Sequence, residues 1–200
     1  MRRDVVLWIV LGIELVLAQV TKAQDPNSQP VYFADGNLKA VVEEALGAKD
    51  PNVGDMLRLG SLNGQNLGIT DLTGLEYAKN LASLNLPENQ IADITALAHL
   101  TRLFRLYLWG NRITDISSLS GLTALKDLDL RANLIEDISP LVNLSGLTQL
   151  HLAENTITNI TPLSGIVHLV DLGLGGTRIG DISPLDGLTQ LESLALRDNP

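Results

Sequence analysis

The sequence predicts an α/β solenoid, a horseshoe-shaped stack of short repeats with a parallel sheet on its concave face and a helical cap at its N-terminal end. Leucine recurs every 22 residues from Leu59 to Leu191 without an insertion, and such a fixed period indicates a repeat architecture. Two further leucines of each repeat alternate with other residues, as in a strand that buries one face. Ahead of the repeats, apolar residues at helical spacing predict the cap.

Residues 1–23 have the pattern of a signal peptide. A basic start at residues 1–3 precedes an apolar run over Val5–Leu17, and small residues at positions 21 and 23 suit a signal peptidase that cleaves after Ala23. Glu14 leaves the run short for a membrane span of ~20 residues, so a retained anchor is the weaker alternative. We therefore expect a secreted or cell-surface protein whose mature chain does not insert into a membrane.

A short flexible linker is expected over residues 24–30, followed by the N-terminal cap over residues 31–58. Asp35 or Asn37 is suited to begin the cap helix and Gly47 to end it. The apolar side of this helix is formed by Leu38, Val41, Val42, Ala45 and Leu46. Two aromatic residues are expected to pack in the cap, Tyr32 and Phe33. Such a helix would cover the first edge of the sheet.

Residues 59–200 form six full 22-residue units and a truncated seventh, each beginning at a leucine: Leu59, Leu81, Leu103, Leu125, Leu147, Leu169 and Leu191. Counted from that leucine, positions four and six are also apolar in almost every unit. Position nine carries Asn89, Asn111, Asn133, Asn155 and Asn199, with Thr177 as the departure. An asparagine amide can satisfy backbone donors and acceptors together, so this column predicts a ladder of bonds between neighbouring units.

An acidic column at position thirteen consists of Asp71, Asp93, Asp115, Asp137 and Asp181, with Asn159 in unit five. Repeated carboxylates raise the possibility of calcium, but each unit supplies one carboxylate where Ca²⁺ takes six or more oxygens. Aspartate that accepts backbone N–H bonds at a turn is the favoured reading, and Pro140, Pro162 and Pro184 then fix the following backbone. We expect no metal and no cofactor.

The units resemble the leucine-rich-repeat family, whose signature L-x-x-L-x-L-x-x-N-x-I is met in full by four consecutive units over residues 81–168. They are similar to the 22-residue class found in bacterial internalin-type surface proteins and in eukaryotic phosphatase-regulator repeats. The resemblance implies a non-enzymatic module that recognises surface proteins. No cap pattern follows the seventh unit, and we expect either a longer protein or a partner to cover that edge.

Positions three, five and seven of each strand are predicted to face solvent, and solenoids use this face for binding. Unit three places Arg105, Tyr107 and Trp109 there, residue types enriched at binding hot spots. The candidate partner site is formed by Arg105, Tyr107, Trp109, Asp127, Asp129, Arg131, Gln149 and His151. Within it we expect a surface ion pair between Asp129 and His151. The alternative for Trp109 is a purely local cation–π contact with Arg131.

The remaining function classes are limited by composition. A formal charge of −9 argues against a nucleic-acid partner, and the absence of cysteine excludes thiol chemistry. Gly173 and Gly175 resemble part of a phosphate loop, yet in the repeat pattern they only leave unit six without outward side chains. A protein partner is therefore expected. The alternatives are a glycan-binding module, the recognition arm of a longer enzyme, and an intracellular phosphatase-regulator type of repeat protein.

Overall fold

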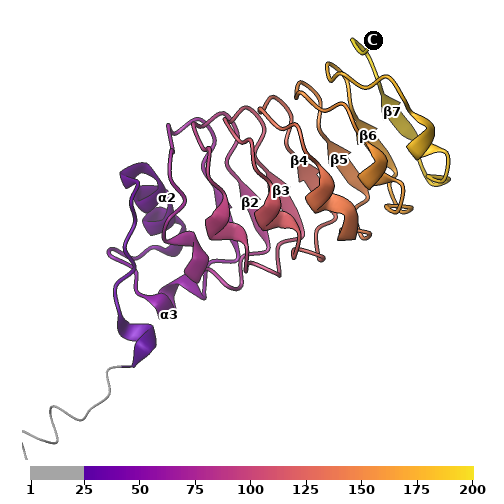
Figure 1. Ribbon diagram of the computed structural model, residues 1–200. Helices are drawn as coiled ribbons and strands as arrows, with labels where there is room; N and C mark the ends of the chain where they lie inside the picture. The colour runs from indigo at the N-terminus through magenta and orange to yellow at the C-terminus, as the bar shows by residue number, and fades with distance from the viewer. Residues whose placement is uncertain (1–24) are drawn as a thin grey trace, which may run out of the picture.

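The computed structural model describes residues 25–200, so the predicted signal peptide lies outside the described residues. Seven strands form one parallel sheet in the order of the sequence (Figure 1). The strands are β1 (Ser61–Asn63), β2 (Ser83–Asn85), β3 (Arg105–Tyr107), β4 (Asp127–Asp129), β5 (Gln149–His151), β6 (Asp171–Gly173) and β7 (Ser193–Ala195). Each strand residue pairs with the residue 22 positions further on, as in Leu106 with Leu128. The predicted solenoid is confirmed.

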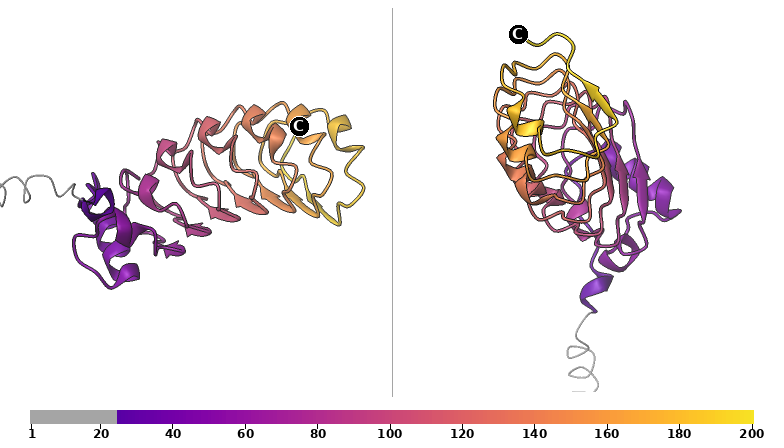
Figure 2. Two further views of the ribbon diagram at one scale, coloured as in Figure 1. Left: turned by 90° about the horizontal axis from the view of Figure 1, so that it is seen from below. Right: turned by 90° about the vertical axis from the view of Figure 1, so that its right-hand side faces the viewer.

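On the side of each turn opposite to its strand, the chain forms a short 3-10 helix (Figure 2, right). These helices are η2 (Leu75–Tyr77), η3 (Thr95–Leu97), η4 (Ser117–Leu119), η5 (Ser139–Asn143), η6 (Thr161–Leu163) and η7 (Ser183–Leu185). The repeated leucines and isoleucines fill the space between the two sides, and most are fully buried. Burial decreases at the C-terminal end, where Leu194 is 42% exposed and Ile182 is 50% exposed.

The N-terminal cap contains the predicted helix, α2 (Gly36–Leu46), and a second short helix, α3 (Val53–Met56). Asp35 caps α2 by accepting N–H bonds from Asn37 (2.8 Å) and Leu38 (3.0 Å), and Gly47 ends it with φ of 62°. The helix buries Leu38, Val42 and Leu46. Val41 is half-buried and Ala45 is exposed, so the apolar side is narrower than the sequence predicts.

Asp35 also joins the cap to unit one. Its second carboxylate oxygen accepts bonds from the N–H (2.8 Å) and the hydroxyl (2.9 Å) of Thr70. Burial raises the pKa of Asp35, but the bonds from Leu38, Thr70 and Asn37 together outweigh that effect and leave the pKa below its usual value. The charged form of this largely buried side chain therefore holds the cap on the stack.

Two features of the N-terminal segment differ from the expectation. Residues 25–30 contain a 3-10 turn, η1 (Pro26–Ser28), and bond to the cap: Val53 N–H donates to Gln29 C=O (3.0 Å), and Pro30 forms a bridge with Asn52. Of the two aromatic residues expected to pack, Phe33 is partly buried against the core, whereas Tyr32 is 73% exposed. Tyr32 is therefore not part of the cap packing.

The asparagine ladder is confirmed. Asn133, for example, accepts the N–H of Ile113 in the preceding unit (3.0 Å) and donates to the carbonyls of Leu108 and Leu130 (both 3.0 Å). Thr177 cannot reproduce this pattern, because its hydroxyl donates to Leu174 C=O (2.8 Å) within its own unit. In the described chain, the join between units five and six consequently lacks the asparagine bonds that connect the neighbouring pairs of units.

The aspartate column is turn chemistry, as the sequence indicates. Each aspartate accepts the N–H of the residue two positions on, as Asp137 does from Ser139 (2.8 Å). This backbone bond, and a second bond from the Ser139 hydroxyl, lower the pKa of Asp137. Across residues 25–200, no three His, Cys, Asp or Glu side chains come together in a group that could hold a metal ion. No helix in that range is long and apolar enough to cross a membrane.

Candidate binding face

The outward side of strands β1–β7, formed by positions three, five and seven of the units, is here called the sheet face. All eight candidate residues lie on it, in units three to five. The register places Arg105, Asp127 and Gln149 in one row and Tyr107, Asp129 and His151 in the next. The sequence therefore predicts correctly which residues are neighbours across the strands.

An aromatic and arginine cluster forms around β3. The Arg105 guanidinium lies 5.5 Å from the Phe104 ring centre and 5.9 Å from the Tyr107 ring centre, and its Nε is 3.4 Å from Asp127. The Tyr107 hydroxyl donates to the same Asp127 carboxylate. Burial, and then this hydrogen bond, raise the pKa of Tyr107. Phe104, which is 42% exposed, also belongs to this cluster, although the sequence did not place it in the predicted site. The sequence signal for it is its position directly before Arg105.

In unit four, Asp129 and Arg131 form a close ion pair. Arg131 Nε lies 2.9 and 3.1 Å from the two Asp129 oxygens, and Arg131 Nη2 lies 2.6 Å from Oδ2. These hydrogen bonds, which Arg131 donates to the Asp129 carboxylate, raise the pKa of Arg131. The expected pair between Asp129 and His151 is therefore wrong, because an arginine on the same strand face is permanently charged and binds a carboxylate through two donors.

The expected cation–π alternative for Trp109 does not form either. Among residues 25–200, the cation–π contacts are those of Arg105, and the Arg131 guanidinium is held by Asp129. Trp109 is half-buried and borders a hollow of about 290 Å³ with Arg131, Ala132 and Glu154. Part of its ring surface is thus available to a partner.

His151 turns in the opposite direction, toward unit six. Its Nε2 lies 3.4 Å from Asp171 Oδ2. A Cβ at Gly173 would lie 2.9 Å from His151 Nδ1, so the missing side chain of Gly173 makes room for the imidazole ring. No hydrogen bond connects His151 with a serine or threonine hydroxyl in the described chain.

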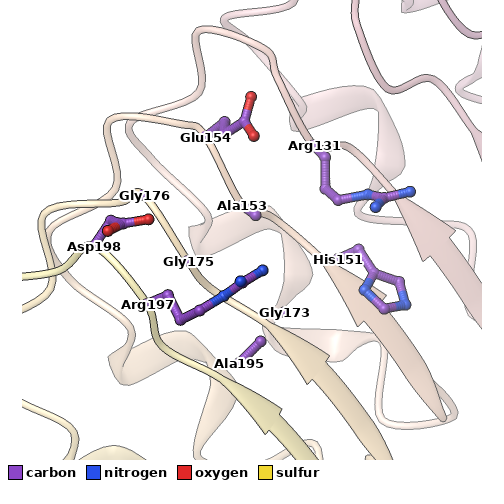
Figure 3. Close-up of a pocket in the computed structure, with 10 residues that line it drawn as sticks. All are labelled: Arg131, His151, Ala153, Glu154, Gly173, Gly175, Gly176, Ala195, Arg197 and Asp198. Carbon is purple, nitrogen blue, oxygen red and sulfur yellow. The ribbon is translucent and has the colours of Figure 1, made fainter.

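A second hollow of about 250 Å³ lies over units five to seven (Figure 3). Its rim carries charged or titratable side chains: Arg131, His151, Glu154, Arg197 and Asp198. Its floor includes Gly173 and Gly175, whose lack of side chains the sequence shows. The depth could not be read from the sequence, because it depends on the length and direction of side chains in both neighbouring units.

The repeats are similar to those of known leucine-rich-repeat proteins. A family model for leucine-rich repeats in two copies matches residues 101–143. The structure of an internalin, inlF, from Listeria monocytogenes is 31% identical, covers 90% of this chain and 61% of its own, and superimposes with a TM-score of 0.71. Internalin C2 of the same organism is also 31% identical, with coverages of 86% and 89% and a TM-score of 0.66. This chain thus spans 61% of the inlF structure.

A more distant neighbour shows the fold alone. The functional domain of InlJ from Listeria monocytogenes is 22% identical, with coverages of 84% and 46% and a TM-score of 0.53. It is described as including a cysteine ladder, whereas the present chain has no cysteine and uses an asparagine ladder. No curated protein sequence matches the chain.

Proposed function

Because the chain belongs to the internalin-like class of leucine-rich-repeat proteins, we propose that it is an exported recognition module that binds a protein partner through its sheet face. The candidate site extends from Arg105, Tyr107 and Trp109 in unit three to Gln149 and His151 in unit five. The family supplies the interaction role; the position of the site and the export of the chain are our inferences.

The observation that carries the proposal is the cluster of Phe104, Arg105 and Tyr107 beside Trp109. Arginine and aromatic side chains dominate binding energy at interfaces, with losses of ~2 kcal/mol or more when a central one is truncated. Here Asp127 contacts both Arg105 and Tyr107, which fixes their positions before any partner arrives. Fixed side chains lose less conformational freedom on binding, so more of the contact energy contributes to affinity.

Export rests on residues 1–23, whose basic start, apolar run and small residues before position 24 have the order of a signal peptide. N-terminal sequencing of protein recovered from the medium or cell surface tests this point. We expect a mature chain that begins at Gln24. A recovered chain that begins at Met1 would contradict it.

The site is tested by cross-linking from the sheet face. A photoreactive phenylalanine analogue replaces Trp109, and in a matched control it replaces Tyr77, an exposed aromatic residue on η2 at the opposite side of the solenoid. The labelled proteins are illuminated with extracellular protein fractions, and cross-linked species are identified by mass spectrometry. We expect a discrete protein adduct from position 109 and none from position 77.

Affinity for the adduct partner is then measured with alanine variants. Tyr107→Ala and Trp109→Ala should each weaken binding by about 2 kcal/mol, or roughly 30-fold in Kd, while Tyr77→Ala leaves it unchanged. Circular dichroism confirms that the variants remain folded. Unchanged affinity in both sheet-face variants would refute the site. A glycan array that gives a signal dependent on Trp109, with no protein adduct, would replace the protein partner with a sugar.

A further inference from the structure

We propose that the hollow over units five to seven is a socket for one acidic side chain of the partner, whose carboxylate binds Arg197. This inference rests on the proposed function, since it names the chemistry that the partner presents beside the aromatic cluster. Two arginines, Arg131 and Arg197, occupy the same position of units four and seven.

Unit four shows how this solenoid holds a carboxylate on its sheet face. Arg131 occupies position seven, and Asp129 at position five of the same unit meets it through Nε and Nη2, at 2.6 to 3.1 Å. Two parallel N–H bonds to one carboxylate are a strong and directional arrangement. The Arg131–Asp129 pair is thus an intramolecular example of the contact that we infer between Arg197 and a carboxylate of the partner.

Unit seven has the same arginine without its carboxylate. Arg197 occupies position seven, but position five is Ala195, whose methyl group cannot pair with it. Among residues 25–200, no carboxylate lies within 4.0 Å of an Arg197 nitrogen, although Asp198 is its neighbour in sequence. Figure 3 shows the Arg197 side chain reaching over the glycine floor toward His151. A carboxylate from another molecule can therefore take the place that Asp129 takes at Arg131.

Unit six contributes no side chain at two outward positions, Gly173 and Gly175, and both glycines line the hollow of about 250 Å³. The neighbouring units lie close against them: an added Cβ would be 2.9 Å from His151 Nδ1 at Gly173 and 3.1 Å from the Arg197 carbonyl oxygen at Gly175. The hollow is therefore the space that remains between His151 and Arg197 above the two glycines. This space admits a side chain end-on.

The charges at the rim favour a singly charged group. Glu154 and Asp198 border the same hollow, and their repulsion of an anion increases with its charge. A phosphate dianion is therefore a poorer occupant than a carboxylate, which carries one charge and matches the fork of a guanidinium.

The hollow over units five to seven adjoins the hollow beside Trp109. It shares Arg131 and Glu154 with the hollow beside Trp109. Trp109 and Arg197 occupy position seven of units three and seven, which are four strands apart. That separation is roughly 19 Å, which an extended chain covers in about six residues, so a partner segment that packs an apolar side chain beside Trp109 can place an acidic side chain on Arg197 about six residues away.

The experiment needs no identified partner. The purified protein is titrated with N-acetyl-glutamate N-methylamide and, separately, with the glutamine analogue and with inorganic phosphate. Binding is followed by NMR through the amides of Gly173 and Gly175. We expect a saturable response to the glutamate compound, and one at least about tenfold weaker to the glutamine analogue and to phosphate.

Two variants test the assignment to Arg197. Arg197→Gln removes the guanidinium, and Ala195→Asp places a carboxylate where Asp129 stands relative to Arg131. Both should weaken the glutamate response at least about tenfold, while Arg178→Gln, which removes an exposed arginine outside the hollow, leaves it unchanged. Unchanged glutamate binding in Arg197→Gln or in Ala195→Asp would overturn the inference. So would phosphate binding that equals or exceeds glutamate binding.

The outcomes separate this inference from the proposed function. A glutamate response that depends on Arg197 supports the socket even when position 109 yields no adduct, a result that counts only against the proposed partner site. An adduct from position 109 without any glutamate response overturns the socket and leaves the partner site in place.

Discussion

Units two to five and units six and seven follow the same 22-residue pattern, yet they differ in how completely their polar groups are paired. In the earlier group, the asparagine ladder is continuous, and the sheet-face arginines, Arg105 and Arg131, each contact a carboxylate. In the later group, Thr177 interrupts the ladder, Arg197 has no ionic partner among the described residues, and Leu194 is 42% exposed.

The 22-residue pattern therefore contains two sets of positions that vary independently, one that specifies the fold and one that specifies the surface. Inward leucines and the position-nine asparagine specify the coil, and they can be weakened locally without loss of the strand register, because β6 still pairs with β5 and β7. Outward positions specify what the surface can bind. The outward arginines of units three and four each contact a carboxylate, whereas Arg197 in unit seven has no ionic partner among the described residues.

The largest effect that separates the two regions is expected from equivalent core leucines. Leu128→Ala creates a cavity at a fully buried site and should lower the free energy of unfolding by about 3–4 kcal/mol. Leu194→Ala, at the same position of unit seven, should cost less than about 1 kcal/mol because that side chain is 42% exposed. Urea denaturation measures both. Equal losses would show that the C-terminal end is as well packed as the middle.

A smaller effect is expected at the N-terminal cap, where both carboxylate oxygens of Asp35 accept hydrogen bonds. Asp35→Ala should cost about 2–4 kcal/mol, since it removes a helix cap and two bonds to Thr70. The folded-state pKa is lowered, so this stability is present above the unfolded pKa of about 4 and is lost as pH falls through the folded pKa.

Denaturation at a series of pH values measures this contribution. The difference between the wild-type protein and Asp35→Ala should be constant near neutral pH and should shrink in acid. Asp25→Ala serves as the control, because Asp25 caps only the exposed turn η1 and should cost less than about 0.5 kcal/mol. A difference that grows in acid would contradict the assignment.

The smallest effect is expected from repairing the ladder. Thr177→Asn can restore bonds to Ile157 N–H and Leu152 C=O, equivalent to those that Asn133 makes two units earlier, and should stabilise the protein by about 1 kcal/mol. The reverse change, Asn133→Thr, should destabilise it by about 2 kcal/mol. Thermal melts compare the two variants. A lower melting temperature in Thr177→Asn would mean that unit six does not accept the regular turn.

Most of the fold could be predicted from the sequence because the 22-residue period alone fixes the register of every strand pair. The role of Asn133 follows from backbone hydrogen bonding, and Asp35 was one of two candidates for the helix cap. The exposure of Tyr32 could not be predicted, because it depends on how α2 and η1 approach the first unit.

For the candidate site, the sequence predicts which residues lie next to each other across the strands, but it does not predict which of them form ion pairs. Strand alternation places Asp129 next to His151, and it equally places Asp129 two residues from Arg131 on one face. The choice between them depends on side-chain reach and charge, which the period does not encode. The sequence shows that Gly173 and Gly175 have no side chains. It does not show the hollow above them, because the hollow depends on where the His151 and Arg197 side chains lie.

The hydrogen bonds between neighbouring strands run along the length of the solenoid, from one turn of the chain to the next. A load applied to the two ends is therefore carried through every join in series, as in a chain of links. Under such a load, the join that is held least tightly separates first. The join between units five and six lacks the asparagine bonds of the regular joins, because Thr177 stands in place of the position-nine asparagine.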